Sequence, residues 1–395
     1  MATRRRPPRL TAVRRDEERV TALELFFDLV FVLAITQCTA LMADQPTWSG
    51  IAKGLAVLAV LWWSWGGYAW LTSVLDPEEG AVRIVMFVAM AAMLVAALAV
   101  PQAFGDLGLT FAIAYGVVRT AHIGLFVIAS RDDPGLRRSV LGLAAGTAVG
   151  VGLLVLASFF DGSAQGLIWL LAIGLDFAEP FFFGAEGWEL MPEHFAERYG
   201  LIVLIALGES IVAIGVGAAG DVDTGIIVAA CFGIAVAAAM WWAYFDVVAV
   251  VAARRLSSTP AGRQQNEMAR DAYSYLHLPM VAGIVLIALG MKKTLEHVDE
   301  PLGTVPAAAL AGGAALYLLA HVAFRLRVVQ TLNVQRLLVA IVLLAFAPVA
   351  DEPDALITIA IVAAVLWALI VFEVVRFADF RAQTRAELLH GRTGE

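Results

Sequence analysis

Long apolar runs, separated by short polar turns, follow one another along almost the whole chain. Each run reaches the roughly 18 residues that an α-helix needs to cross the ~30 Å of hydrocarbon in a bilayer. Pro residues in the connections, as at Asp76-Pro77 and Glu352-Pro353, are typical of turns. The pattern predicts an all-α polytopic integral membrane protein with about twelve transmembrane helices, at residues 21–43, 51–73, 82–101, 107–129, 138–160, 164–183, 199–217, 224–252, 272–291, 303–324, 332–349 and 354–377.

The composition agrees with this pattern. The chain has 395 residues, of which 61% are hydrophobic and 16% are charged, whereas a soluble domain carries about 25% charged residues. Both cysteines, Cys38 and Cys231, lie within apolar runs, so we expect no disulfide framework. No stretch between the runs is long enough for a large soluble domain.

Basic residues are distributed unevenly between the two sides of the predicted membrane protein. With the N-terminus inside, the cytoplasmic segments contain 23 of the 27 Lys and Arg residues. The opposite side has Lys53, Lys292 and Lys293, and Arg119 lies within a span. This bias predicts that both termini are cytoplasmic. The Arg-rich tail, residues 1–20, is expected to attract anionic membrane lipid, and no nucleic-acid partner is expected.

Two dipeptides recur at the same offset. Glu18-Arg19 and Glu197-Arg198 lie 179 residues apart, as do Trp62-Trp63 and Trp241-Trp242. The recurrence predicts two parallel six-helix repeats, although a chance match in so apolar a chain stays open. The predicted organisation is a first repeat at 21–183, a cytoplasmic interfacial connector at 184–198, a second repeat at 199–377 and a cytoplasmic C-terminal tail at 378–395.

Several segments resemble a known family. They are ELFFDLVFVLAITQ (24–37), LWWSWGGYAW (61–70), HFAERYGLIVLIALGESIVAIG (194–215), MWWAYFD (240–246) and YLHLPMVAGIVLIALG (275–290). In this order they resemble the signature segments of the bacterial low-temperature-requirement A family. The resemblance implies a multi-pass membrane protein linked by name to growth in the cold, with no agreed biochemical activity. A weaker similarity is to potassium channels built from six-span repeats, whose first helix carries the motif Arg-x-x-x-Phe-Ser-Asp. In this chain Phe27 is followed directly by Asp28, so the serine of that motif is missing.

Ionisable side chains within the predicted spans are the candidates for function. A charge at the bilayer centre costs about 2.5–3.5 kcal/mol, so such groups normally face other helices and find partners. The acidic side chains within the spans outnumber Arg119, the single arginine considered with them. Some of these acids must therefore be protonated, solvated near an interface or neutralised by a transported cation. The acids are Glu24, Asp28, Asp176, Glu179, Glu209 and Asp246; the other candidates are Arg119, His122, His277 and His321.

Spacing places some of these groups on common helix faces. Glu24 and Asp28 are four residues apart, and Asp176 and Glu179 are three apart, so each pair shares one face. We expect the first helix to turn its acids inward, with Arg119 as the partner of Asp28 and a cytoplasmic arginine such as Arg19 as the partner of Glu24.

Less specific interpretations stay open for most of these residues. Glu24 and Glu179 also fit solvated carboxylates at an interface. Arg119 also fits a structural pair with Asp28 or Glu209. For His277 and His321 a hydrogen-bonded packing role is favoured over proton relay. The tryptophan pairs are more typical of interface anchors and packing than of a ligand cage.

Enzymatic motifs are missing from the sequence. GESIV (208–212) lacks the second glycine of G-x-S-x-G, and there is no H-E-x-x-H or P-loop. We therefore expect no enzyme, cofactor or metal site. The predicted function is a proton- or cation-coupled secondary transporter. Asp28 and Glu209 are its predicted binding sites and Arg119 a competing counter-charge; Glu24, His122, Asp176, Glu179 and Asp246 complete the predicted pathway.

Two alternatives to the transporter are kept. One is a cation channel whose pore is lined by the first and seventh helices. The other is a non-transport protein, either an intramembrane enzyme or a lipid-associated structural protein that supports growth in the cold. The sequence names neither the small solute or cation nor the oligomeric state.

Overall fold

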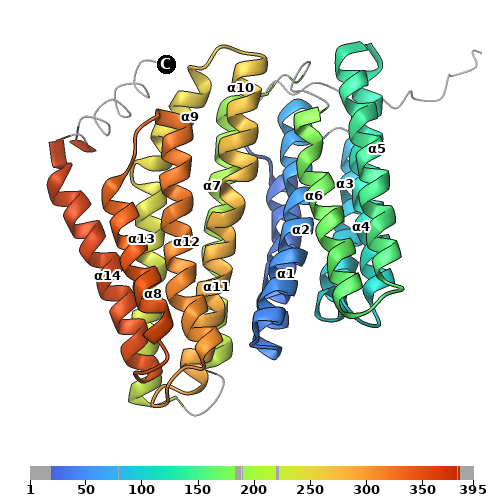
Figure 1. The fold of residues 1–395 in the computed structure, drawn as a ribbon. Helices are drawn as coiled ribbons and strands as arrows, with labels where there is room; N and C mark the ends of the chain where they lie inside the picture. Colours follow the sequence, from blue (N-terminus) through green and yellow to red (C-terminus); the bar gives the residue numbers. More distant parts are fainter. Residues whose placement is uncertain are drawn as a thin grey trace, which may run out of the picture. The chain divides into compact units, whose positions relative to one another are not determined.

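The computed structural model describes residues 19–382, apart from 79, 133, 183–187, 189, 219–221 and 380. Its secondary structure is helical, as predicted, and the order of the helices follows the predicted spans (Figure 1). The helices are α1 (Ala22–Asp44), α2 (Trp48–Val74), α3 (Gly80–Ala99), α4 (Gly108–Ala129), α5 (Pro134–Ala157), α6 (Gly162–Phe182), α7 (Pro192–Gly217), α8 (Thr224–Phe245), α9 (Val248–Ser257), α10 (Arg263–Met268), α11 (His277–Glu296), α12 (Thr304–Val329), α13 (Val334–Phe346) and α14 (Ala355–Arg376).

Eleven helical segments within the described residues are long and apolar enough to cross a membrane, and a shorter apolar segment covers Val334–Val349. The start of α12 lies beside the start of α14, because Thr304 donates a hydrogen bond to Asp351 at 2.6 Å and Ala355 N donates to Glu300 O at 2.9 Å. Since α12 and α14 begin at the same end, the segment with α13 must run back between them. The described residues therefore contain eleven membrane-length apolar segments and one shorter apolar segment, in agreement with the predicted all-α polytopic fold of about twelve helices.

Two predicted spans have interruptions. The span at 224–252 is divided at Asp246-Val247 into α8 and the short α9, whose last turn carries Arg254 and Arg255. The span at 272–291 follows α10 and a π-helical segment, Ala269–Tyr275. π-Helical turns are rare and locally release backbone groups from the α-helical pattern.

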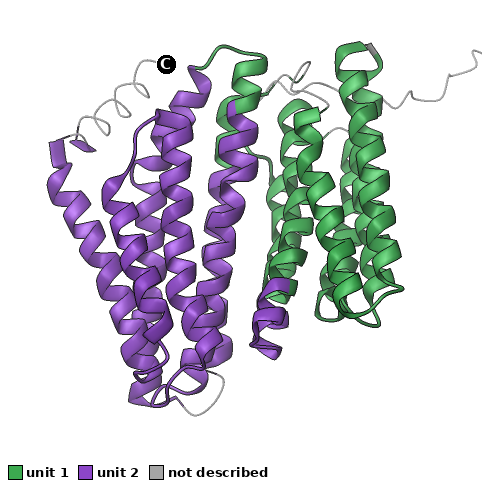
Figure 2. Ribbon diagram, viewed as in Figure 1, with its two compact units in different colours: residues 1–38, 53–198, 259–267 green, residues 39–52, 199–258, 268–395 purple. Residues whose placement is uncertain are grey.

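The chain divides into two compact units (Figure 2). Unit 1 consists of residues 1–38, 53–198 and 259–267; unit 2 consists of 39–52, 199–258 and 268–395. Residues 1–18 of the predicted tail (1–20), residues 184–187 and 189 of the predicted connector (184–198) and the chain after 382 lie outside the described residues. The repeat stays a prediction. The two arginines that its offset would equate differ, since Arg19 is exposed whereas Arg198 is fully buried.

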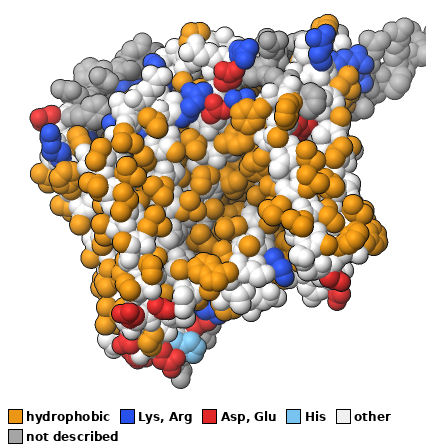
Figure 3. All heavy atoms as spheres, in the orientation of Figure 1, with side chains coloured by type: hydrophobic (Ala, Val, Ile, Leu, Met, Phe, Trp, Pro, Cys, Tyr) orange, Lys and Arg blue, Asp and Glu red, His pale blue; other side chains and the backbone are white. Residues whose placement is uncertain are grey.

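The helices present apolar side chains outward as well as inward. Leu98, Leu167 and Val375 are exposed by 57%, 66% and 74%. On the face shown in Figure 3, hydrophobic side chains cover much of the helix lengths, and charged groups gather toward the helix ends. This surface suits a bilayer, because lipid tails solvate apolar side chains that water would not.

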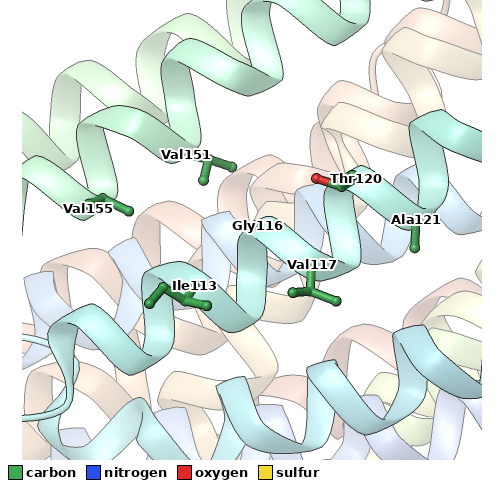
Figure 4. Close-up of a pocket in the computed structure, with 7 residues that line it drawn as sticks. All are labelled: Ile113, Gly116, Val117, Thr120, Ala121, Val151 and Val155. Atoms are coloured by element: carbon green, nitrogen blue, oxygen red, sulfur yellow. The ribbon is translucent and has the colours of Figure 1, made fainter.

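An apolar groove of about 400 Å³ lies along the seam of α4 and α5 in unit 1. Ile113, Gly116 and Val117 line it from α4, and Val151 and Val155 line it from α5 (Figure 4). Ile113 and Val117 are exposed by 53% and 41%, so the groove opens outward. Its lining offers little polar chemistry, and the polar groups of unit 1 gather elsewhere.

Candidate functional site

The first helix turns its two acids inward. Glu24 and Asp28 are both 0% exposed, whereas Leu25, Phe26 and Leu29 on the other faces are exposed by 41%, 52% and 61%. This arrangement confirms the expected orientation of α1. It also shows that the interpretation of Glu24 as a solvated carboxylate is wrong, because its side chain is fully enclosed by protein.

Glu24 completes the N-terminal cap of α1. The backbone N–H and hydroxyl of Thr21 donate to Glu24 Oε2 at 2.8 and 3.0 Å, and Glu24 N donates to Thr21 Oγ1 at 3.3 Å. This reciprocal pair is the capping box of the pattern Thr-x-x-Glu, and it satisfies backbone donors that the first turn of a helix leaves open. One oxygen of Glu24 is thereby committed to the helix end, and the other faces α7.

Arg198 of α7 joins both acids. Its Nη1 donates to Glu24 Oε1 at 2.9 Å and to Thr72 Oγ1 at 3.0 Å, and its Nη2 donates to Asp28 Oδ1 at 2.7 Å. His194 Nε2 lies 2.8 Å from the same Glu24 oxygen. All five side chains are fully buried. Paired, hydrogen-bonded charges of this kind fix the register of the helices that carry them.

The helix α7 begins early enough to deliver these partners. Pro192 occupies its first position, where the missing N–H costs nothing, and His194 and Arg198 then lie four residues apart on one face. The prediction that Arg119 is the partner of Asp28 is therefore wrong, because Asp28 is paired with Arg198. Arg198 directly precedes the apolar run at 199–217, and for that reason the sequence pattern places it in the cytoplasmic connector.

α2 supplies the neutral side of this network. Trp65 Nε1 donates to Asp28 Oδ1 at 2.8 Å, and the Arg198 guanidinium lies 5.8 Å from the Trp65 ring. Thr72 donates to Tyr68 O at 3.0 Å, while the Tyr68 ring packs 4.7 Å from Phe27. No donor within the described residues reaches Asp28 Oδ2. Asp28 therefore has one saturated oxygen and one open oxygen.

A second polar cluster in unit 1 joins α4, α5 and α6. Tyr115 donates to Asp176 Oδ2 at 2.9 Å, and Arg119 Nη2 donates to Thr147 Oγ1 at 2.6 Å. Glu179 Oε2 lies 4.0 Å from Arg119 Nη2. Asp176 and Glu179 are exposed by only 4% and 3%, so the interpretation of Glu179 as an interfacial, solvated group is also wrong.

His122 and Tyr68 lie between the two clusters. The rings of Tyr68 and His122 are 5.4 Å apart. Gly67 makes this possible, because a Cβ there would lie 3.0 Å from His122 Cε1 and 3.4 Å from Arg119 Nη1. Within unit 1, the ring contact of Tyr68 with His122 and the close approach of α2 to α4 at Gly67 thus lie between the two clusters.

Comparison with known proteins places the chain. The family model described as bacterial low temperature requirement A protein (LtrA) matches residues 19–375. The chain belongs to the low temperature requirement A family. An uncharacterized protein of Rhizobium meliloti (strain 1021) is 31% identical over 316 residues, covering 77% of this chain and 76% of that protein. No solved structure matches.

In this family member, the network of Glu24, Asp28 and Arg198 is built from segments that carried the resemblance. Glu24 and Asp28 lie in ELFFDLVFVLAITQ, Trp65 lies in LWWSWGGYAW, and His194 and Arg198 open HFAERYGL. Segments far apart in the chain therefore supply one buried network.

Unit 2 holds the remaining predicted residues. Glu209 is 2% exposed, and Asp246 is paired with Arg381. His277 Nδ1 lies 3.1 Å from Ala272 O, and His321 Nδ1 lies 2.9 Å from Tyr317 O, as expected for hydrogen-bonded packing. Within the described residues, no group of three His, Cys, Asp or Glu side chains is placed to hold a metal ion.

Three elements of this LtrA protein were missed from sequence. One is Arg198, whose four-residue spacing from His194 was a usable signal. Another is the capping box at Thr21, which the Thr-x-x-Glu pattern reveals. The third is a buried pair in unit 2, in which Arg336 donates to both oxygens of Glu373 at 2.9 and 2.8 Å. The charge distribution counts Arg336 among the cytoplasmic basic residues, so it is not among the candidates predicted from the sequence.

The first tryptophan pair has the packing role that was one of its two expected roles. Trp62 and Trp63 are exposed by 0% and 9%, so they pack inside unit 1, whereas Trp241 of the second pair is 44% exposed. Trp65, three residues after Trp62, hydrogen-bonds Asp28.

Proposed function

We propose that this LtrA protein is a secondary transporter coupled to protons or other cations, in the bacterial plasma membrane. The observation that supports the proposal is the charge inventory of unit 1. Four carboxylates, those of Glu24, Asp28, Asp176 and Glu179, are buried with two arginines, Arg119 and Arg198. Burying an uncompensated charge costs several kcal/mol, so additional positive charge has to accompany the carboxylates.

Asp28 is the proposed coupling residue. Its Oδ1 is held by Trp65 and Arg198, and its Oδ2 is open to a proton or cation. A cation on Asp28 would compete with Arg198 for the carboxylate and weaken the contact between α1 and the start of α7. Arg198 would keep its bond to Glu24, so the helices would loosen on one side of the network and stay joined on the other.

The proposal is tested by transport measured with the full-length protein. Purified protein is reconstituted in liposomes that trap a pH-sensitive dye, and solutes are offered whose levels differ between cells with and without the protein. We expect a solute-dependent proton flux in the wild type and its loss in Asp28→Asn. Glu373→Gln is the matched control, because it removes a buried, arginine-paired carboxylate of unit 2. Full flux of an identified solute in Asp28→Asn would refute the assignment.

Glu209 stays in the proposal as the binding group of unit 2. Its burial fits the prediction made from sequence, and Glu209→Gln in the same assay measures its part. We propose that the function is not enzymatic. We also propose that the two six-helix halves are repeats related by an axis along the membrane normal.

A cation channel is the competing proposal, and it rests on the same buried acids. Planar-bilayer recording separates the two functions, because a channel gives unitary currents whereas a carrier turns over too slowly to be resolved. Unitary currents that disappear in Asp28→Asn would replace the transporter by a channel.

A further inference from the structure

The acids of α6 lie against a glycine pair of α5. Asp176 and Glu179 are three residues apart, and Gly146 and Gly150 are four apart, so the two pairs match along the helix seam. A Cβ at Gly146 would lie 2.4 Å from Glu179 Oε1, and a Cβ at Gly150 would lie 2.5 Å from Asp176 Oδ1. The absence of side chains at these two positions makes room for the carboxylates.

Four buried polar atoms of this cluster form no hydrogen bond with the described part of the chain. Among the described residues, no donor reaches either oxygen of Glu179 or Oδ1 of Asp176, and Arg119 Nε donates to no acceptor. These side chains are exposed by only 3%, 4% and 1%. Nearly all buried polar atoms in proteins have a partner, so a group of orphaned atoms indicates a bound water, ion or ligand.

The position of Arg119 supports the same interpretation. Its Nη2 lies 4.0 Å from Glu179 Oε2, which is beyond hydrogen-bond length, although the opposite charges attract strongly in a dry site. Arg119 instead donates to Thr147 at 2.6 Å. A gap of this size between a buried donor and a buried acceptor is typical of a bridging water, which leaves the other carboxylate oxygens open to a cation.

Charge balance defines the class of the missing group. Asp176 and Glu179 contribute two negative charges, and Arg119 returns one, so one positive charge completes the cluster. A divalent ion would leave an excess positive charge in the hydrocarbon. The other groups that face the cluster, Tyr115 and Thr147, are hydroxyls, and the neighbouring His122 packs against Gly67.

We infer that Asp176 and Glu179 form a binding site for one monovalent cation, with Arg119 as a fixed counter-charge that keeps the site from binding two. The site is separate from the Glu24–Asp28–Arg198 network, where the α1 carboxylates receive donors from α2 and α7. It deepens the proposed transporter by adding a second cation to the coupled cycle. Its test measures binding in the absence of transport, so the site and the transporter can fail separately.

Cation binding is measured by thermal unfolding of the full-length protein in lipid nanodiscs. NaCl, KCl, NH₄Cl or CaCl₂ replaces choline chloride at constant ionic strength, so that screening stays fixed. A cation that binds only the folded state raises Tm as its concentration passes Kd. Proton occupancy is followed separately by the infrared C=O band of protonated carboxyl groups during a pH titration.

Three variants and two controls complete the experiment. Glu179→Gln and Asp176→Asn remove a ligand, and Gly146→Ala keeps both carboxylates but fills the space beside Glu179. Glu373→Gln removes a buried carboxylate in unit 2, and Gly152→Ala adds a methyl on α5 where nothing lies within 4 Å. The controls should bind as the wild type does.

The expected result is a rise in Tm with one monovalent cation, lost in Glu179→Gln and at least tenfold weaker in Gly146→Ala. A protonated-carboxyl band that is lost in Glu179→Gln would support the site and identify its cation as the proton. The inference is overturned if Ca²⁺ is the preferred ion, if the wild type binds neither a monovalent cation nor a proton there, or if Glu179→Gln and Asp176→Asn bind as the wild type does.

Discussion

At the scale of single residues, one guanidinium group determines the state of two acids. Arg198 donates to Glu24 and Asp28 from inside a region where neither carboxylate meets solvent. Buried pairs add little net stability when they form, because both ions lose their hydration. Removing one partner is costly, because the other charge then stays buried alone. Substitution of Arg198 should therefore destabilise the protein by more than the net energy of its ion pairs suggests.

Arg198→Ala is expected to destabilise the protein by about 3–5 kcal/mol, because it leaves two buried carboxylates without their cation. The measurement is the unfolding midpoint in mild detergent, followed by tryptophan fluorescence. Arg83→Ala, at an exposed position of α3, is the control and should change the midpoint little. Equal midpoints for the two variants would show that Arg198 is dispensable to the network.

Trp65→Phe tests the donor on the other side of Asp28. The ring is largely retained, but the 2.8 Å hydrogen bond to Oδ1 is lost, which should cost roughly 1–3 kcal/mol for a buried charged acceptor. Trp169→Phe is the matched control, because Trp169 is 3% exposed and packs on Phe104 and Phe111 through its ring. Comparable losses of stability in both variants would mean that packing, and not the hydrogen bond, explains the effect.

At the scale of elements, the first turn of α1 combines two tasks in one side chain. Glu24 caps the helix through Thr21 and pairs with Arg198 through its other oxygen. The cap fixes where α1 begins, and the beginning of α1 sets the depth at which Asp28 meets Arg198. A change in the cap should therefore be felt in the network.

Thr21→Ala should lower the stability by about 1 kcal/mol, because the hydroxyl that caps Glu24 N and binds Glu24 Oε2 is lost. Thr21→Ser keeps the hydroxyl and should behave as the wild type does in the same thermal unfolding assay. A serine variant as unstable as the alanine variant would indicate that the methyl group matters instead of the cap.

The α5–α6 seam gives a second prediction at this scale. Gly150→Ala should destabilise the protein, because the new methyl would lie 2.5 Å from Asp176 Oδ1 and force the carboxylate away. Gly152→Ala, two residues on, meets open space and should stabilise the helix by roughly 0.5–1 kcal/mol, since alanine favours helix more than glycine does. Opposite signs of the shift in unfolding midpoint are the diagnostic result, and equal shifts would contradict the seam geometry.

At the scale of the whole molecule, the number of traversals decides where the termini lie. At about 1.5 Å per residue, the 13 residues of α13 span only about 20 Å, less than the ~30 Å of a bilayer core. The contacts of α12 with the start of α14 nevertheless require the chain to return between them. If the segment with α13 crosses the membrane as well, the number of crossings is even and both termini are expected on one side.

The basic residues of the connections predict that this side is the cytoplasm. Fusions of alkaline phosphatase and of a fluorescent protein to the N-terminus and, separately, to the C-terminus test this, because phosphatase is active only outside the cytoplasm. We expect fluorescence and no phosphatase activity for both terminal fusions. An active phosphatase at one terminus alone would mean that α13 does not cross.

Apolar length and turn residues are local properties, so the amino-acid sequence was enough to place the helices. The positions of the apolar segments, the inward face of α1 and the family could all be predicted from consecutive residues. The pairing of Glu24 and Asp28 on one face followed in the same way from their spacing of four.

Only the tertiary structure decided which charges meet. Arg198 lies 174 residues from Glu24, and Arg336 lies 37 residues from Glu373. Each arginine lies at the edge of an apolar run. At such an edge, the neighbouring sequence looks the same whether the arginine belongs to a loop or to the first turns of a buried helix. The packing of α1 and α2 against α7 places Arg198 beside Asp28, and the packing of α13 against α14 places Arg336 beside Glu373. No pattern of neighbouring residues contains that information, because it depends on contacts between segments that are distant in the chain.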